Sequence, residues 1–257
     1  MAELGELRAV RAFARGLAVI RCFSQEARRL TLTDVAKKTD LSRAGARRFL
    51  YTLCELGYAS TDGKYFWLTP RVLDIGYSYL SSMELWGFAQ EYLEKMSAAL
   101  GESTSISVLE GHDVVYVIRV PTRRILTSSL NVGSRLPAHV ISMGRIQLAA
   151  LSSRDLDRYL TEVKLTRYTP YTVISPDELQ QILLKDRERG YSIVNRELEL
   201  GISGIAVPIL DRQGRTIAGM NVSYHPDRAI EPNKIDEFLE ALNNTKAKIE
   251  DVLRMRG

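Results

Sequence analysis

Hydrophobic residues in the first 70 positions recur at the three- and four-residue spacing of amphipathic helices. Ser or Thr, which can cap a helix N-terminus, precedes two of these segments, and a glycine follows the last. The pattern predicts three helices: Gly16–Ser24 with Leu17, Ile20 and Phe23 inward, Asp34–Lys38 capped by Thr33, and Arg43–Leu56 capped by Ser42 and ended by Gly57.

Only the turn Thr39–Leu41 separates the second predicted helix from the third. A short helix, a tight turn and a longer helix form the helix-turn-helix pattern, here with apolar Leu41 in the turn. The β-prone segment Tyr58–Leu68 follows, and its Asp62-Gly63 pair is a hairpin signal that predicts a wing. We expect the longer helix to bury one stripe of residues: Ala46, Phe49, Leu50, Leu53 and Cys54.

Two more helical patterns follow Pro70, a residue that suits the first turn of a helix. Leu73, Tyr77 and Leu80 share one face, and a second apolar stripe runs through Glu84–Leu100 and ends at Gly101. Helix-turn-helix proteins commonly pair to read two half-sites, so we expect these helices to join two copies. The alternative is that the second stripe packs only on its own chain.

From Ser103 the hydrophobic period changes to two, which is typical of strands. Strands alternating with helical patterns predict an α+β domain. The expected strands are Thr104–Leu109, Val114–Val120, Ile125–Asn131, Tyr191–Val194, Ile202–Leu210 and Thr216–Tyr224. The expected helices lie within Pro137–Leu151, Asp155–Leu160, Pro176–Arg189 and Pro232–Met255.

The net charge of this 257-residue chain is +4, but the charge is unevenly distributed. Residues 1–70 hold twelve Lys and Arg against seven Asp and Glu, a net charge of +5 that leaves −1 for the remainder. A basic head on a near-neutral body is the electrostatic pattern of a protein that binds a polyanion.

Arginines crowd the first turns of the third predicted helix, beside the small residues Ala44 and Gly45. A recognition helix places its N-terminal residues at base edges, and Arg matches the O6 and N7 atoms of guanine. We expect Arg43 and Arg47 to read bases, and Arg48 to reach a phosphate or pin the helix. Simple solvation of these arginines is the alternative. The expected contacts to double-stranded DNA are Ser42, Arg43, Gly45, Arg47, Arg48 and Lys64.

Hydrophobic residues make up 45% of the chain and charged residues 26%, ordinary values for a globular protein. Cys22 and Cys54 form no CxxC or Cys/His cluster, so we expect two buried, reduced thiols and neither a metal nor a cofactor. The N-terminus lacks the apolar core of a signal peptide, and no apolar run could span a bilayer. These features predict a soluble, cytoplasmic protein with no membrane partner.

The sequence lacks HExxH, GxSxG, GxGxxG and phosphate-loop motifs. The three histidines, His112, His139 and His225, do not have metal-ligand spacing. Glu197 and Glu199 could form a site, but we expect them on a solvated or dimer-facing loop. We therefore expect no catalytic residues and no enzymatic activity.

The segments together resemble the IclR family of bacterial transcriptional regulators along essentially the whole chain. The matching stretches are LTDVAKKTDLSRAGARRFLYTLCELGY, LTPRVLDIGYSYL, VGSRLPAHVISMGRIQLAAL and RELELGISGIAVPILDRQGRTIAGMNVS. Within the family, the details ARRFL, RVLDIGYSYL, SMGR and ELELGI look most similar to the regulators of aromatic-acid catabolism, those of the β-ketoadipate pathway.

The resemblance implies a GAF-like effector-binding domain and a homodimer, or a dimer of dimers, on a palindromic operator. It also implies a pocket for a small organic acid beside the central sheet. Carried over by position, the pocket residues are Leu136, Ser142 and Met143 through their backbone amides, Val194, Ile202, Gly204, Asn221 and Ser223.

The chemistry of these positions agrees in part. Ser142 and Met143 start a predicted helix, where free amides favour a carboxylate. Val194 and Gly204 stand where family members with small 2-oxo-acid effectors carry Asp and Cys, so this pocket is roomier and more apolar, which favours an aromatic acid. Three nearby residues could add positive charge, or could equally be exposed or structural: Arg135, His139 and Arg145.

The sequence therefore predicts a DNA-binding transcriptional regulator of aromatic catabolism genes that a small organic acid controls. The alternative is a DNA-binding oligomeric regulator with no small-molecule effector. The expected organisation is a winged helix-turn-helix domain at 1–70, a helical linker for dimerisation at 71–101 and an effector-binding domain at 102–257.

Overall fold

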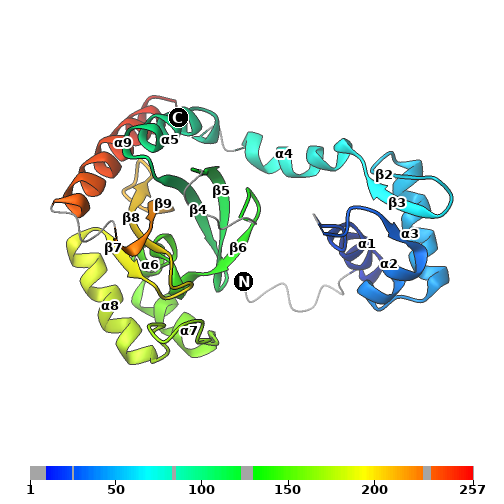
Figure 1. Cartoon of the computed structure of the whole chain (residues 1–257), viewed down its shortest axis with the longest axis horizontal. Coiled ribbons are helices and arrows are strands. Elements are labelled where there is room, and N and C mark those ends of the chain that lie inside the picture. Colours follow the sequence, from blue (N-terminus) through cyan, green and yellow to red (C-terminus); the bar gives the residue numbers. More distant parts are fainter. Residues whose placement is uncertain (1–9, 25, 83–84, 123–129, 228–232, 257) are drawn as a thin grey trace. The chain divides into compact units, whose positions relative to one another are not determined.

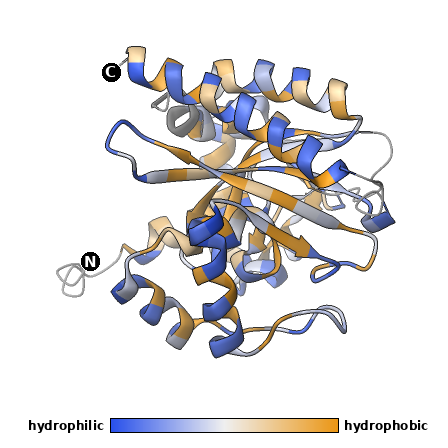
Figure 2. Ribbon diagram, turned by 90° about the vertical axis from the view of Figure 1, so that its left-hand side faces the viewer, coloured by the Kyte–Doolittle hydropathy of each residue, from blue (hydrophilic) through white to orange (hydrophobic). Residues whose placement is uncertain are grey.

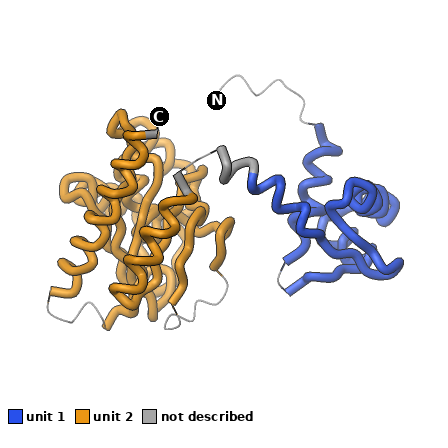
Figure 3. The backbone as a smooth tube through the Cα atoms, turned by 90° about the horizontal axis from the view of Figure 1, so that it is seen from above, with its two compact units in different colours: residues 1–82 blue, residues 83–257 orange. Residues whose placement is uncertain are grey.

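The computed structural model describes residues 10–24, 26–82, 85–122, 130–227 and 233–256. The chain divides into two compact units, Met1–Ser82 and Met83–Gly257 (Figure 3). α4 (Leu73–Ser82) belongs to the first unit and α5 (Leu85–Leu100) to the second. The expected domain boundaries at residues 70 and 101 stay a prediction.

The first unit is a winged helix-turn-helix. Its helices are α1 (Arg11–Arg21), α2 (Leu32–Thr39) and α3 (Arg43–Glu55). A small antiparallel sheet of order β1-β3-β2 completes it, with strands β1 (Leu30–Thr31), β2 (Ala59–Thr61) and β3 (Tyr65–Leu68). The buried core is Val19, Leu30, Val35, Ala36, Ala46, Leu50, Leu53, Ala59 and Phe66.

The first two helices begin earlier than predicted. α1 ends at Arg21, and it buries Val19, whereas Leu17 is 40% exposed. Thr31, not Thr33, caps α2. Thr31 Oγ1 accepts a hydrogen bond from the Asp34 amide (3.2 Å), and the Asp34 carboxylate accepts one from the Thr31 amide (2.9 Å). This reciprocal pair satisfies two free helix-end donors, which explains why the helix starts at Leu32.

The third helix follows the prediction closely. α3 buries Ala46, Leu50 and Leu53, but Phe49 and Cys54 are only half-buried. Cys22 is half-buried as well, so the expectation of two buried cysteines is wrong, although both are free thiols.

The wing is the predicted hairpin with a shifted turn. The Asp62 amide donates to the Tyr65 carbonyl (3.2 Å), so the two turn residues are Gly63 and Lys64 rather than Asp62 and Gly63. Gly63 has a φ of +92°, which favours glycine at the first turn position. The short strand β1, which pairs with the wing strand β3, was not predicted because two residues carry no periodicity.

The two helices after the wing differ in whether their apolar faces are exposed or buried. Pro70 begins a 3₁₀ turn, η1 (Pro70–Val72), that leads into α4. Leu73 and Tyr77 of α4 are strongly exposed, whereas the stripe of α5 packs on its own chain against α9 (Lys234–Arg256), β4 and β5. The predicted place of the Leu80 side chain on the apolar face, and the predicted start of the second pattern at Glu84, lie outside what the structure describes.

The second unit is built on a six-stranded antiparallel sheet of order β6-β5-β4-β9-β8-β7. Figure 1 shows α5 and α9 on one face and α6 on the other, with α7 and α8 beyond it. Figure 2 shows hydrophobic residues concentrated on the strands, whereas hydrophilic residues recur along the C-terminal helix. The strands are β4 (Ser103–Glu110), β5 (Asp113–Val120), β6 (Arg135–Pro137), β7 (Ser192–Asn195), β8 (Ser203–Leu210) and β9 (Thr216–Tyr224).

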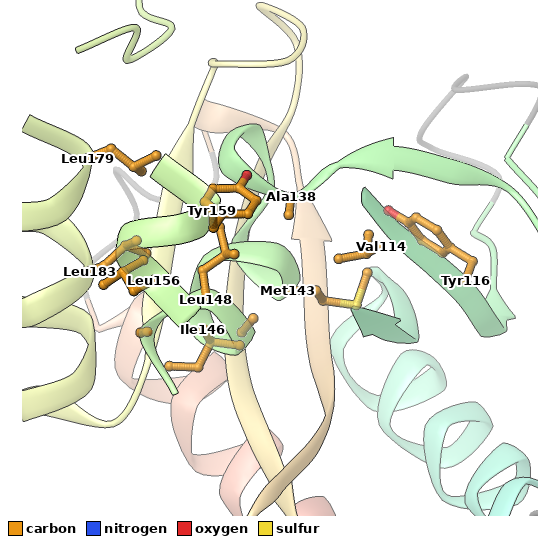
Figure 4. Packing of buried hydrophobic residues seen from close by; sticks show 12 residues of the cluster. Val114, Tyr116, Ala138, Met143, Ile146, Leu148, Leu156, Tyr159, Leu179 and Leu183 are labelled. Carbon is orange, nitrogen blue, oxygen red and sulfur yellow. The ribbon is translucent and has the colours of Figure 1, made fainter. Parts of the chain in front are cut away.

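The remaining helices are η2 (Ala138–Val140), α6 (Ser142–Ala149), α7 (Ser153–Glu162) and α8 (Pro176–Arg189). The core between α6, α7, α8 and the sheet includes Val114, Met143, Leu148, Leu156 and Leu183 (Figure 4). The predicted α+β class is confirmed. The predicted strand Ile125–Asn131 lies mostly outside the described residues, and the strand β6 was not predicted. Within the described ranges, no helix is long and apolar enough to cross a membrane.

Candidate functional site

The exposed face of α3 presents three arginines. Ser42 Oγ accepts a hydrogen bond from the Gly45 amide (3.1 Å), which fixes the start of the helix. Arg43, Arg47 and Arg48 are all exposed, and no described carboxylate forms an ion pair with them. The first turn of α3 contains no acidic residue either, so the positive helix end and the guanidinium groups reinforce each other.

Asp62 fixes the backbone of the wing tip, which presents an exposed lysine. Asp62 Oδ1 accepts hydrogen bonds from the amides of Lys64 (3.0 Å) and Tyr65 (2.7 Å), and these bonds hold the pKa of Asp62 below its usual value. Arg29 pairs with Asp62 (3.3 Å) and lies over the Trp67 ring (4.2 Å), so it is engaged inside the fold. The Lys64 ammonium remains exposed at the tip.

A hollow next to the recognition helix adds a second arginine to Arg48. Arg15 and Arg48 both line it, and both are exposed without a described carboxylate in ion-pair contact. α1 contains no acidic residue at all. The two helices therefore offer a shared cationic surface, whose remaining lining residues are Ala12, Gly45, Phe49 and Thr52.

The second unit contains a cavity at the N-terminus of α6, bounded by strands β5 to β9. The empty space between its lining atoms is about 540 Å³, a volume that includes open solvent at its mouth. Most of its wall is apolar, as is usual for small-molecule sites. The lining residues are Tyr116, Arg119, Leu130, Leu136, Val140, Ile141, Ser142, Val194, Leu198, Ile202, Ser203, Gly204, Asn221 and Ser223.

The structure brings together seven of the eight pocket residues implied by the family resemblance: Leu136, Ser142, Val194, Ile202, Gly204, Asn221 and Ser223. The side chain of the eighth, Met143, packs beside Val114 in the core (Figure 4), and Met143 is not among the residues that line the cavity, so the expected role of its backbone amide stays a prediction. These residues come from four separate strands, one helix and the turn before β8, which explains why no local motif contains them.

Several buried polar atoms of this cavity have no partner among the described residues. Ser142 Oγ and Asn221 Oδ1 are both buried without a hydrogen bond. The Asn221 amide nitrogen donates to Ser223 Oγ (2.9 Å), which leaves the Asn221 oxygen as a free acceptor. Unsatisfied buried groups cost free energy, and in a cavity they indicate where a ligand or water binds.

Arg119 is the cation of the cavity, and the sequence reasoning missed it. Its guanidinium reaches towards Ser105 Oγ (3.5 Å) and lies 5.8 Å from the Tyr116 ring centroid. The Arg119 Nε is buried without a hydrogen bond, and no described carboxylate forms an ion pair with this residue. The signal was present in the sequence, because Arg119 is the single charged residue of the otherwise apolar segment Val114–Val120.

The strand register places Arg119 and Asn221 in one row across the sheet. Arg119 pairs with Ser105 on β4, and Ser105 pairs with Asn221 on β9. Two strand spacings separate their backbones by about 10 Å. Tyr116, next to Arg119 in the cavity wall, keeps its phenol neutral because burial raises its pKa to about 12.

None of the three cations named from the sequence lines the cavity. Arg135 is exposed and pairs with Glu110 (2.8 Å) and Asp113 (3.3 Å). His139 is buried, and burial lowers its pKa to about 4, so the ring is neutral. Arg145 is buried and pairs with Glu197 at 2.6 Å.

The expected solvated loop at Glu197 is wrong for that residue. The side chain of Glu197 is buried against Arg145, whereas Glu199 is exposed. In the part of the chain that the structure describes, no three His, Cys, Asp or Glu side chains gather as a metal site would require.

Two family models match the chain. The model for the IclR helix-turn-helix domain matches residues 12–63, and the model for the bacterial transcriptional regulator IclR C-terminal matches residues 77–251. The chain belongs to the IclR family of bacterial transcriptional regulators. The family predicted from the sequence is therefore confirmed, and so is its fold of a winged helix-turn-helix followed by an α/β domain.

The chain is similar to regulatory proteins of known name and to a solved structure with a bound ligand. The Pca regulon regulatory protein of Pseudomonas putida is 42% identical over 89% of this chain and 79% of its own. The p-hydroxybenzoate hydroxylase transcriptional activator of Acinetobacter baylyi is 38% identical over 93% of this chain and 90% of its own. The crystal structure of an IclR homolog from Microbacterium hydrocarbonoxydans, complexed with 4-hydroxybenzoate, has a TM-score of 0.83 at 25% identity and covers 95% of this chain and 99% of that one.

Proposed function

We propose that this protein binds operator DNA through α3 and the wing, and that a hydroxylated aromatic carboxylic acid in the cavity of the second unit controls it. The target genes in this proposal are those of aromatic-acid breakdown. The similarity to the Pca regulon regulatory protein and to the p-hydroxybenzoate hydroxylase transcriptional activator supports this choice. No catalytic step is part of the proposal.

The observation that carries the effector proposal is the guanidinium of Arg119 in a mostly apolar cavity, where its buried Nε has no hydrogen bond and no described carboxylate pairs with it. A half-buried cation without a counter-ion favours an anionic ligand, since charge-assisted hydrogen bonds are the strong ones. The free amides of Ser142 and Met143 are a second place for a carboxylate. We assign the carboxylate to Arg119, because a full charge attracts an anion more strongly than the partial charge of a two-turn helix.

The part of the cavity around Asn221 favours a ligand group that donates a hydrogen bond. The free acceptor Asn221 Oδ1 cannot bind a carboxylate, which has no proton to give, but a phenolic hydroxyl satisfies it. The hydroxyls of Ser142 and Ser223 also line this part of the cavity, and each can donate or accept a hydrogen bond. An aromatic ring with a carboxylate at one end and a hydroxyl at the other matches this arrangement, as in the 4-hydroxybenzoate complex of the Microbacterium homolog.

The DNA contacts follow from the charges of the first unit. Arg43 and Arg47 stand on the first two turns of α3, where a recognition helix reads bases. Arg15, Arg48 and Lys64 are exposed cations suited to phosphate oxygens. Sequence-specific binding in this proposal rests on the α3 arginines, and general affinity rests on the surrounding cations.

Pairing of two copies is part of the same proposal. Leu73 is 72% exposed and Tyr77 is 67% exposed on α4, whereas α5 uses its apolar stripe inside its own unit. Apolar side chains on one helix face gain free energy when a second copy covers them. A homodimer that presents two α3 helices would read a palindromic operator.

Titration calorimetry on the full-length protein tests the effector assignment with three ligands. We expect 4-hydroxybenzoate to bind, benzoate to bind more weakly because it lacks the hydroxyl, and phenol to bind weakest because it lacks the carboxylate. Gel-shift titration on a fragment selected from genomic DNA then measures whether the bound acid changes operator affinity. Specific DNA binding that no acid alters would favour a regulator without an effector.

A further inference from the structure

A buried ion pair lies behind the effector cavity. Arg145 stands one turn after Ser142 on α6, and Glu197 lies in the turn between β7 and β8. The Arg145 Nη2 and the Glu197 Oε2 are 2.6 Å apart, with 2% and 8% of the two side chains exposed. Neither residue lines the cavity, so neither would touch a bound acid.

Glu197 is also bonded to a third segment of the chain. Its carboxylate accepts a hydrogen bond from the Val173 amide (3.0 Å), and its carbonyl accepts one from Thr172 Oγ1 (2.7 Å). The carbonyl of the preceding residue, Arg196, accepts a hydrogen bond from Thr169 Oγ1 (2.6 Å). Arg196 has a φ of +59°, uncommon for a non-glycine residue, so these bonds hold the turn in a shape that its own backbone does not favour.

Arg145 links the ion pair to the segment that precedes α6. Its Nε donates to the His139 carbonyl (2.8 Å) in η2. The ion pair therefore joins η2, α6 and the turn at 196–202. Each of these three segments contributes to the cavity wall: η2 through its last residue Val140, α6 through Ser142, and the turn through Leu198 and Ile202.

Stability alone is a weak reason to bury two charges. Removing both ions from water costs several kcal/mol each, and well-packed apolar residues often serve stability as well as a buried pair does. A buried pair with several directional bonds instead selects one geometry. Here the pair fixes the positions of η2, α6 and the turn at 196–202 relative to one another, and all three segments form part of the cavity wall.

We propose that Arg145 and Glu197 are positioning residues that hold the turn at 196–202 against the cavity and thereby set the affinity of the protein for its acid effector. This inference rests on the proposed effector site. Loss of the ion pair frees Leu198 and Ile202, which line the cavity, while the α3 face in the other unit keeps its structure.

The test compares Glu197→Gln and Arg145→Lys with a matched control, Asp186→Asn. Asp186 is another fully buried carboxylate in the same unit, and it pairs with Arg189 of α8 at 2.6 Å. It lies within electrostatic reach of Arg145, but no hydrogen bond or ion pair among the described residues joins it to the turn at 196–202, and neither Asp186 nor Arg189 lines the cavity. All three variants are made in the full-length protein. Both Glu197→Gln and Asp186→Asn remove a buried charge. Only the substitutions at Glu197 and Arg145 break the ion pair that joins α6 to the turn at 196–202.

Hydrogen exchange of peptides spanning 196–202, measured without any ligand, is the first readout. We expect faster exchange in Glu197→Gln and Arg145→Lys than in Asp186→Asn. Equal exchange in all three variants would overturn the proposal, whatever the protein binds. Arg145→Lys, which keeps the charge but cannot span both the His139 carbonyl and Glu197, supplies the same comparison if Glu197→Gln does not fold.

Calorimetry with 4-hydroxybenzoate is the second readout. We expect the Kd to rise about tenfold in Glu197→Gln and Arg145→Lys, with operator affinity within about twofold of the wild type and an unchanged Kd in Asp186→Asn. A Kd that rises equally in all three variants, in step with their melting temperatures, would reduce the pair to a general stabilising role. If the wild type binds no acid, the proposed effector fails, but the exchange comparison still decides whether the pair holds the turn.

Discussion

Ser142 Oγ lies where a side chain on residue 204 would stand. A Cβ placed on Gly204 would come within 2.8 Å of Ser142 Oγ and 3.6 Å of the Asn221 amide nitrogen. Because Gly204 has no side chain, the polar part of the cavity between α6 and β9 stays open. The site therefore needs the empty space beside Gly204 as well as the Ser142 hydroxyl and the Asn221 amide.

Gly204→Ala is expected to weaken effector binding about tenfold while the protein stays folded, because the new methyl group displaces the Ser142 hydroxyl into the cavity. Calorimetry measures the Kd, and thermal melting checks the fold. Gly201→Ala is the control, since a Cβ at Gly201 meets no atom within 4 Å. An unchanged Kd in Gly204→Ala would place the ligand elsewhere.

Arg119→Ala is expected to weaken binding of 4-hydroxybenzoate by ~1.5–3 kcal/mol, the typical contribution of a hydrogen bond to a charged group. The same variant is expected to bind phenol as the wild type does, because phenol has no carboxylate. Arg135→Ala removes an arginine at the outer edge strand β6 and serves as the control. If Arg119→Ala loses no affinity for the acid, the carboxylate binds at the α6 amides instead.

Arg43→Ala and Arg47→Ala are each expected to cost ~1–3 kcal/mol of operator binding and to relax its specificity. Lys64→Ala, at the wing tip, is expected to weaken binding to operator and random duplex alike. Competitive gel shifts with the selected fragment and with random duplex measure both quantities. Unchanged discrimination in both arginine variants would contradict the assignment of α3 as the base-reading helix.

Arg15→Ala tests the hollow between α1 and α3. If Arg15 binds a phosphate, its removal lowers the slope of log K against log salt by ~0.9 without changing the preference for operator. Arg21→Ala removes an exposed arginine from the other end of the same helix, outside the hollow, and is expected to leave the slope unchanged. Equal effects of the two substitutions would assign only a diffuse electrostatic role to α1.

Local pattern was sufficient for much of the fold. The α8 helix, Pro176–Arg189, has the bounds that its proline start and Gly190 end predict, and β4, β5, β8 and β9 lie within a residue or two of their predicted ranges. Errors arose where the deciding interaction was a specific contact rather than a period. The Thr31–Asp34 capping pair moved the start of α2, and the pairing of Leu30 with Phe66 created the strand β1.

The sequence by itself determined the basic head, the helix-turn-helix with its arginines, the order of strands and helices, and the family. These properties depend on residues close together in the chain, where spacing translates directly into structure. Tertiary structure alone decided that Arg119 enters the cavity, that Arg145 turns away to Glu197 and that Met143 faces the core. The physical reason is that a side chain's burial and partners depend on which strands become neighbours. Residues as far apart in the chain as 119 and 221 reach the wall of one cavity only once the sheet has formed.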